Sequence, residues 1–254
     1  NDVYSGNVMY CLTKDQLCIQ QHNVYSANPV DFGTYTNNRY FNPYNELSIK
    51  VINFIAGNKV YTLERWRADR GEDAGSKRSP LRLPEYSTTQ ELSSNLVAKG
   101  NFNSRADGWT GWPTNGQLTR IPMANGNGAL KVYLPDASMY PSLSIHQTDY
   151  FPIQNGAWYR VKFNQKSNAN GQFTVGIKGQ STIGNPYTTW QRDIPFSNQR
   201  RNLEMYFQSN LTDQAWIQFG NSWTDPMYYL DNVEVTRVDV QPLDPHARHK
   251  LLVN

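Results

Sequence analysis

The segment WYRVKFNQ, residues 158–165, alternates apolar and polar side chains from Tyr159 to Asn164. Tyr159, Val161 and Phe163 fall on one face, and the polar residues between them fall on the other. Successive side chains of a β-strand point to opposite faces, so this alternation is typical of a half-buried strand. The segment therefore predicts one strand of a sheet that packs a single face onto a core.

The same period recurs on both sides of this segment. The other alternating runs are SLSIHQ (142–147), QFTVGIKG (172–179), NLEMYFQS (202–209), AWIQFG (215–220) and YYLDNVEVTRV (228–238). Polar turns such as MANGNG, SNANG and SNLTDQ separate them. Regular strands joined by short polar turns predict an all-β fold, an antiparallel β-sandwich of jelly-roll type, over residues 92–240.

Residues 1–91 follow a different pattern. Their short β-type runs do not alternate cleanly, and turns rich in Asn and Pro separate them, which is more typical of a solenoid than of a sandwich. One helix is expected over LERWRADR, with Thr62 as its N-cap and Gly71 as its C-terminal stop. The polar stretch STTQELSS (87–94) is interpreted as the linker between the two parts.

The composition excludes some classes of partner. The net charge is only +3 and the basic residues are spread along the chain, so neither nucleic acid nor an anionic membrane is expected to bind. No run approaches the length of a membrane span. Aromatic residues make up 13% of an otherwise polar chain, which leaves amphipathic rings available for a surface.

The two cysteines, Cys11 and Cys18, flank a short polar stretch. If that stretch is a turn, the two thiols meet at disulfide distance. Two unpaired, half-buried thiols explain the sequence equally well. Both interpretations stay open, and the cysteines do not indicate a cellular compartment.

Alternation also singles out candidate binding residues. It puts Trp216 and Gln218 on the outer face of AWIQFG, His146 on that of SLSIHQ and Lys178 on that of QFTVGIKG. A tryptophan side chain that stays exposed to water lacks the roughly 2–3 kcal/mol of stabilisation that burial would give. Either another part of the protein or a ligand is therefore expected to cover Trp216. A flat ring surrounded by polar groups suits a sugar, which presents C–H patches on its face and hydroxyls at its rim. For His146, a solvated position on the strand is the alternative.

Three stretches carry a resemblance to a known family. NLVAKGNFNSRADGWTGW (95–112), the segment from YPSLSIHQ to NQKS (140–167) and YLDNVEVTRV (229–238) resemble carbohydrate-binding modules of the family 4, 16 and 22 type. The resemblance implies that the strands carrying Trp216, His146 and Lys178 share one sheet. It also implies a structural Ca²⁺, held by Asp231 and by Asn103, which stands where those modules have a carboxylate.

The remaining aromatic residues divide into core and ligand candidates. In GNFNSRADGWTGWP (100–113), Trp109 occupies the position at which the resembling modules bury a ring, and is expected to be a core plug. Trp112, Tyr140, Tyr187 and Trp223 lie in loop-like stretches near Pro or Asp and are further candidates for ligand contact.

The first part of the chain resembles a second family. VYTLERWRADRGEDAGS (60–76) is similar to the last coils of a right-handed parallel β-helix, where a Leu-x-x-Trp helix precedes a Gly-x-Asp-x-x-Ser turn. Residues 241–254 look like a tail or the start of a terminal β-domain. This resemblance implies a secreted or cell-surface polysaccharide lyase or glycoside hydrolase.

No catalytic centre is identified. Asp69, Glu72 and Asp73 cluster beside arginines and are interpreted as members of surface ion pairs. The expected function is therefore the binding of a polysaccharide or oligosaccharide by a non-catalytic sandwich module, with no organic cofactor. An enzyme with its site in residues 1–91, and a surface module with an adhesive or structural role, remain as alternatives. The oligomeric state is not indicated.

Overall fold

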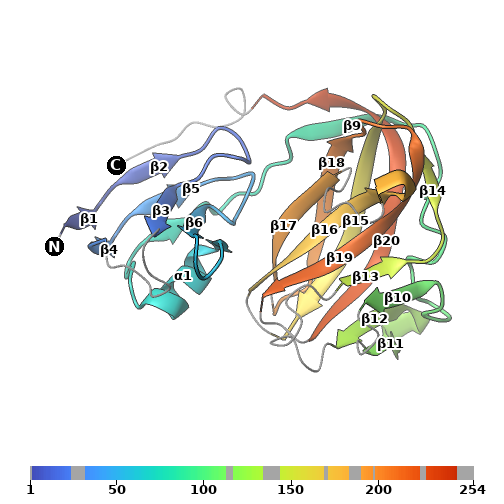
Figure 1. The fold of residues 1–254 in the computed structure, drawn as a ribbon, viewed down its shortest axis with the longest axis horizontal. Coiled ribbons are helices and arrows are strands. Elements are labelled where there is room, and N and C mark those ends of the chain that lie inside the picture. Colours follow the sequence, from blue (N-terminus) through green and yellow to red (C-terminus); the bar gives the residue numbers. More distant parts are fainter. Residues whose placement is uncertain are drawn as a thin grey trace. The chain divides into compact units, whose positions relative to one another are not determined.

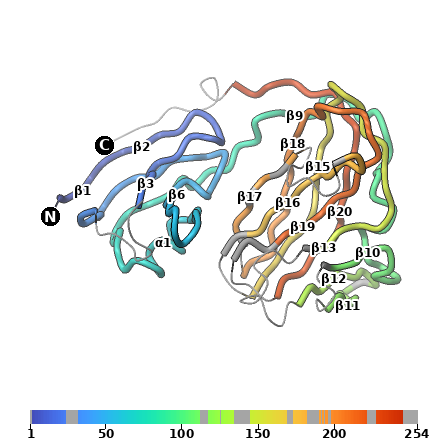
Figure 2. The backbone as a smooth tube through the Cα atoms, in the orientation of Figure 1, coloured from blue at the N-terminus to red at the C-terminus, as the bar shows by residue number. Residues whose placement is uncertain are grey.

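The structure is a computed structural model that describes residues 2–23, 32–112, 117–133, 144–168, 171–182, 190–196, 198–223 and 227–244. The chain forms two compact units (Figures 1 and 2). Unit 1 comprises Asn1–Glu85 and Leu243–Asn254, and unit 2 comprises Tyr86–Pro242. Among the helices in the described parts of the chain, none is long and apolar enough to cross a membrane.

Unit 2 is built from two antiparallel sheets (Figure 1). The first, called the β19 sheet, has the strand order β10 (Trp109–Trp112), β13 (Ser144–Gln147), β19 (Asp213–Trp223), β16 (Gly171–Gly179) and β17 (Trp190–Phe196), and β14 (Phe151–Ile153) also pairs with β19. The second, called the β20 sheet, has the order β11 (Gln117–Pro122), β12 (Gly128–Tyr133), β20 (Met227–Pro242), β15 (Trp158–Ser167) and β18 (Arg201–Gln208), and β9 (Tyr86–Glu91) also pairs with β20. Two short 3₁₀ helices lie between consecutive strands: η1 (Ala124–Gly126) between β11 and β12, and η2 (Gln180–Thr182) between β16 and β17. The predicted all-β sandwich is confirmed.

The core of unit 2 joins the apolar faces of both sheets. The Phe163 ring of β15 meets the Phe219 ring of β19 at a centroid distance of 5.1 Å. Trp109 is only 7% exposed, and its indole Nε1–H donates to the Lys99 carbonyl at 2.9 Å. Its ring packs 5.6 Å from that of Phe102. The prediction of Trp109 as a core plug is therefore confirmed.

Unit 2 begins at Tyr86 rather than after residue 91, because strand β9 takes up the first part of the stretch interpreted as a linker. This strand pairs with β20 through its backbone, from Pro242 opposite Tyr86 to Val238 opposite Glu91. The Glu91 carboxylate also pairs with the Arg160 guanidinium of β15 at 2.5 Å. A polar edge strand of this kind carries no hydrophobic alternation, so its sequence looks like a linker.

Unit 1 contains three small sheets in which strands of successive chain segments pair in parallel. They are β1 (Val3–Ser5) with β4 (Thr34–Thr36); β2 (Val8–Tyr10) with β5 (Arg39–Phe41) and β8 (Lys77–Arg78); and β3 (Ile19–Asn23) with β6 (Ile49–Asn53). A further strand, β7 (Lys59–Tyr61), runs antiparallel to β6. Val3 pairs with Thr34 and Ile19 with Ile49, so the partners in these two sheets are separated by almost the same number of residues. Stacked coils of a solenoid have such a near-constant separation. The kinship with β-helix enzymes stays a prediction.

Helix α1 (Leu63–Arg70) begins and ends where the sequence indicates. The Thr62 hydroxyl accepts from the Arg65 N–H at 3.2 Å, as an N-cap does. Gly71 adopts a left-handed φ of 70° and its N–H donates to the Arg67 carbonyl at 2.8 Å.

Asp73 differs from its interpretation as a surface ion-pair residue, since it is 0% exposed. Its Oδ2 accepts from the Trp66 indole N–H at 2.7 Å, and its Oδ1 accepts from the hydroxyls of Tyr40 and Ser76, each at 2.7 Å. Burial, together with the adjacent carboxylate, raises the pKa of Tyr40, which keeps this donor protonated. Asp69 does form the expected ion pair, with Arg65 at 2.8 Å. The Gly-x-Asp-x-x-Ser turn is therefore a buried anchor for three donors.

The Sγ atoms of Cys11 and Cys18 lie 3.6 Å apart as free thiols. We expect glutathione disulfide to convert them into an intramolecular disulfide, because little backbone movement is needed. Thiol titration and mass spectrometry of non-reduced peptides measure this conversion, with Cys18→Ser as the control. Two thiols that remain titratable after long exposure to the oxidant would contradict it.

Candidate functional site

Strand β19 carries the centre of the candidate site. Its side chains alternate as predicted, with Ala215, Ile217 and Phe219 fully buried in the core. Trp216 and Gln218 therefore lie on the opposite face of the β19 sheet. Two of the strands that pair with β19, β13 and β16, contribute to the same face.

The strand register brings the sequence-predicted residues together. His146 of β13 and Gly176 of β16 both stand opposite Gln218, and Lys178 of β16 stands opposite Trp216. Four candidates from three segments far apart in sequence thus meet on one sheet face. The sheet shared by these strands, which the resemblance implies, is confirmed.

Trp216 is enclosed by side chains of its own unit and is only 8% exposed. Its ring lies 5.6 Å from that of His146 and 5.2 Å, edge-on, from that of Tyr150. The Lys178 ammonium lies over the indole, with Nζ 5.9 Å from the ring centroid. These residues are called the Trp216 cluster: Trp216, Gln218, His146, Lys178 and Tyr150. Lysine and tyrosine side chains therefore supply part of the cover that the sequence leaves to either the protein or a ligand.

Sequence reasoning missed Tyr150. It follows β13 in the stretch TDY, just before β14, where no alternation marks its direction. It remains 45% exposed while it contacts Trp216. An aromatic residue in a polar turn beside a candidate strand was the signal that could have found it.

The indole Nε1–H of Trp216 is buried, and no group in the described part of the chain accepts a hydrogen bond from it. A buried donor without an acceptor costs about 1–3 kcal/mol. The site therefore holds a donor that an incoming hydroxyl would satisfy.

The imidazole of His146 is electrostatically disfavoured as a cation. Burial, and then the nearby Lys178 ammonium, lowers its pKa below the ordinary value of 6.5. At neutral pH the ring is therefore neutral and offers one N–H donor and one nitrogen acceptor. A neutral polar ring beside an indole suits a ligand with hydroxyl groups.

Acid is expected to destabilise unit 2 through His146. Because the pKa of His146 is lower in the folded protein than in the unfolded chain, the unfolded chain binds the proton first as pH falls below about 6.5, and the free energy of unfolding decreases. Thermal unfolding of the wild type and of His146→Gln, followed from pH about 7 to about 5, measures how much of this acid-induced loss of stability comes from His146. The variant should show a smaller acid-induced drop in Tm. An identical drop in both proteins would assign the acid sensitivity to other groups.

Solved structures resemble this fold, although no family model and no curated protein matches the sequence. The N-terminal cellulose-binding domain of Cellulomonas fimi β-1,4-glucanase C is 19% identical over 58% of this chain and 99% of its own, with a TM-score of 0.45. The CBM22-1 xylan-binding domain of Paenibacillus barcinonensis Xyn10C is 13% identical over 59% of this chain and 98% of its own, also with a TM-score of 0.45. The enzymatically active domain of bacteriophage CBA120 tailspike protein 4 is 12% identical over 89% of this chain and 32% of its own, with a TM-score of 0.43.

The resemblance to carbohydrate-binding modules that the sequence predicts recurs among the similar solved structures. At these identities it concerns the fold alone, and the ligands in those names belong to those proteins.

The two residues expected to hold calcium already bond to other groups. Asp231 is buried, which raises the pKa of its carboxyl, and its Oδ2 lies 3.1 Å from the Arg200 guanidinium. The Asn103 Oδ1 accepts from the Gly128 N–H at 3.2 Å. Across the described residues, no group of three or more His, Cys, Asp or Glu side chains could hold a metal. Both oxygens are therefore engaged by groups of the protein, and calcium binding stays a prediction.

The other predicted contact residues are placed only in part. Trp112, in β10, stands opposite Ser144 of β13, and Trp223 ends β19; the side chains of both tryptophans lie outside the described part of the structure. Tyr140 and Tyr187 lie outside the described residues altogether. These four assignments stay predictions.

Proposed function

We propose that unit 2 binds a polysaccharide or oligosaccharide at the Trp216 cluster. The observation that carries this proposal is the buried, unsatisfied indole N–H of a tryptophan on the outer face of the sheet. Polar side chains that can hydrogen-bond hydroxyls surround this ring.

The chemistry follows from the geometry. A pyranose ring places its C–H face on the indole, where Lys178 now lies, and its hydroxyls meet the Gln218 amide and the neutral His146 ring. Lys178 is a long, flexible side chain, so its ammonium can move off the indole and bond to a hydroxyl or ring oxygen. Tyr150, half exposed and edge-on to Trp216, then borders the bound sugar.

The wider setting of this activity is also a proposal. We infer that the chain belongs to a secreted or cell-surface protein that degrades glycans. The parallel pairing of successive strands in unit 1 supports this inference, because solenoids present extended surfaces to long ligands.

The test is a screen of the full chain against an array of plant, algal and bacterial polysaccharides, followed by calorimetry on each hit. We expect saturable binding of at least one glycan. Weaker binding in the presence of EDTA would indicate that the predicted calcium supports the site, and equal binding would indicate that it does not. Assays for reducing ends and unsaturated products in the same samples detect turnover, which would favour the enzyme alternative. An array on which no glycan binds would contradict the proposal and favour the structural or adhesive alternative.

A further inference from the structure

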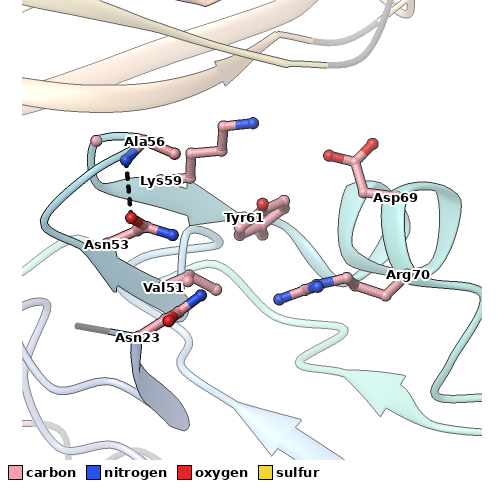
Figure 3. Close-up of a pocket in the computed structure, with 9 residues that line it drawn as sticks. Asn23, Val51, Asn53, Ala56, Lys59, Tyr61, Asp69 and Arg70 are labelled. Carbon is pink, nitrogen blue, oxygen red and sulfur yellow. Dashed lines mark hydrogen bonds between the residues drawn. The ribbon is translucent and has the colours of Figure 1, made fainter. Parts of the chain in front are cut away.

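Unit 1 contains a pocket of about 240 Å³ between β3, β6, β7 and the end of α1 (Figure 3). Its polar lining consists of Asn23, Asn53, Lys59, Tyr61, Asp69 and Arg70. Val51 adds an apolar patch. The volume is below the roughly 300–1,000 Å³ of drug-sized sites and corresponds to a ligand the size of one sugar residue.

Arg70 is the cationic group that sets the chemistry of this pocket. Its one carboxylate, Asp69, is already paired with Arg65 at 2.8 Å. The Arg70 guanidinium lies over the Trp66 ring, with Cζ 5.2 Å from the centroid, and has no carboxylate partner among the residues that the structure describes. It extends from α1 toward Val51 and Asn23 in Figure 3. Lys59 is a second cationic side chain in the lining.

The geometry of these groups fits a particular ligand. A guanidinium offers parallel N–H donors that match the two oxygens of a carboxylate, and the Trp66 ring beside it helps to hold the Arg70 side chain in place. The Asn53 Oδ1 accepts from the N–H groups of Ile55 and Ala56, at 2.9 and 2.8 Å, so this residue turns its amide N–H₂ toward the cavity. Burial, and then the nearby Asp69, raises the pKa of Tyr61, which leaves a protonated hydroxyl in the lining.

We propose that this pocket is a second binding site, specific for a carboxylate-bearing sugar residue, with Arg70 as its anion-binding group. Arg70 holds the carboxylate, Asn53 and Tyr61 meet hydroxyls, and Val51 contacts the C–H face. The site lies wholly in unit 1, so it does not depend on sugar binding by the Trp216 cluster.

Trp66 makes the test specific. It is the only tryptophan of residues 1–85, and its ring lies against Arg70. We expect titration of the full chain with sodium glucuronate or galacturonate to shift the Trp66 indole N–H signal in ¹⁵N NMR spectra saturably. Glucose, which has the same ring without the carboxylate, and sodium sulfate, an anion without the ring, should shift it little.

Substitutions complete the test. Arg70→Gln should weaken binding of the responding sugar acid at least tenfold while the protein stays folded by circular dichroism. Arg82→Gln, which removes an arginine paired with Glu46, and Trp216→Ala should leave that binding unchanged. The absence of a saturable shift, an equal response to sulfate or glucose, or unchanged binding by Arg70→Gln would each overturn the proposal.

Discussion

Asp73→Ala is expected to destabilise unit 1 by on the order of 3–5 kcal/mol. The substitution removes the acceptor of three buried donors at once, the hydroxyls of Tyr40 and Ser76 and the indole N–H of Trp66. Each donor left buried without an acceptor costs about 1–3 kcal/mol. The backbone adds to the loss, because residue 73 has a left-handed φ of 64°, which alanine adopts less readily than aspartate or asparagine.

Urea denaturation, followed by the Trp66 indole N–H signal in ¹⁵N NMR spectra, measures this effect. With two compact units, one free energy of unfolding for the whole chain is not well defined, whereas the Trp66 signal reports on unit 1 alone. Asp15→Asn is the matched control, since that carboxylate is largely exposed and its loss should cost less than about 0.5 kcal/mol.

Asp73→Asn separates hydrogen bonding from backbone conformation. Asparagine tolerates the left-handed backbone and keeps one acceptor oxygen, so we expect an intermediate loss of about 1–3 kcal/mol. If Asp73→Ala and Asp15→Asn had equally small effects, the buried carboxylate would not be an anchor of unit 1.

The role of Asp73 shows where sequence reasoning ends. Its partners Trp66 and Ser76 are near it in sequence, whereas Tyr40 comes from a distant segment that the parallel pairing of β5 with β8 brings close. Local sequence shows three acidic residues among arginines, a pattern that solvent-exposed helix ends share. The Tyr40 donor has no local signature, because only the tertiary pairing of distant segments brings it to this carboxylate.

The sandwich was predictable because its strands each bury a single face. Alternation alone assigns Ile217 and Phe219 to the core and Trp216 to the outer face, and the structure agrees. The same rule fails for β9, a polar edge strand held by backbone pairing with β20. It also gives no direction for Tyr150, which lies in a turn.

Trp216→Ala is expected to reduce the affinity for any glycan found by the array at least tenfold. Stacking a sugar on the indole buries apolar surface worth on the order of 2 kcal/mol, and the substitution also removes the unsatisfied N–H donor. Because the ring is only 8% exposed, the same change should lower the stability of unit 2. Calorimetry must therefore be paired with thermal unfolding of the variant.

Trp216→Phe distinguishes ligand contact from structural support. Phenylalanine keeps a ring beside Tyr150 and His146 but has no N–H, so we expect nearly full stability with affinity reduced about three- to tenfold. Trp158→Phe is the matched control, since Trp158 belongs to the β20 sheet rather than the β19 sheet and its ring packs on Tyr86 of the same sheet, 4.5 Å away. Binding that survives Trp216→Ala, or falls as much in Trp158→Phe as in Trp216→Phe, would place the sugar elsewhere. If Trp216→Phe alone weakens binding while Tm stays unchanged, the unsatisfied indole N–H is a donor to the ligand.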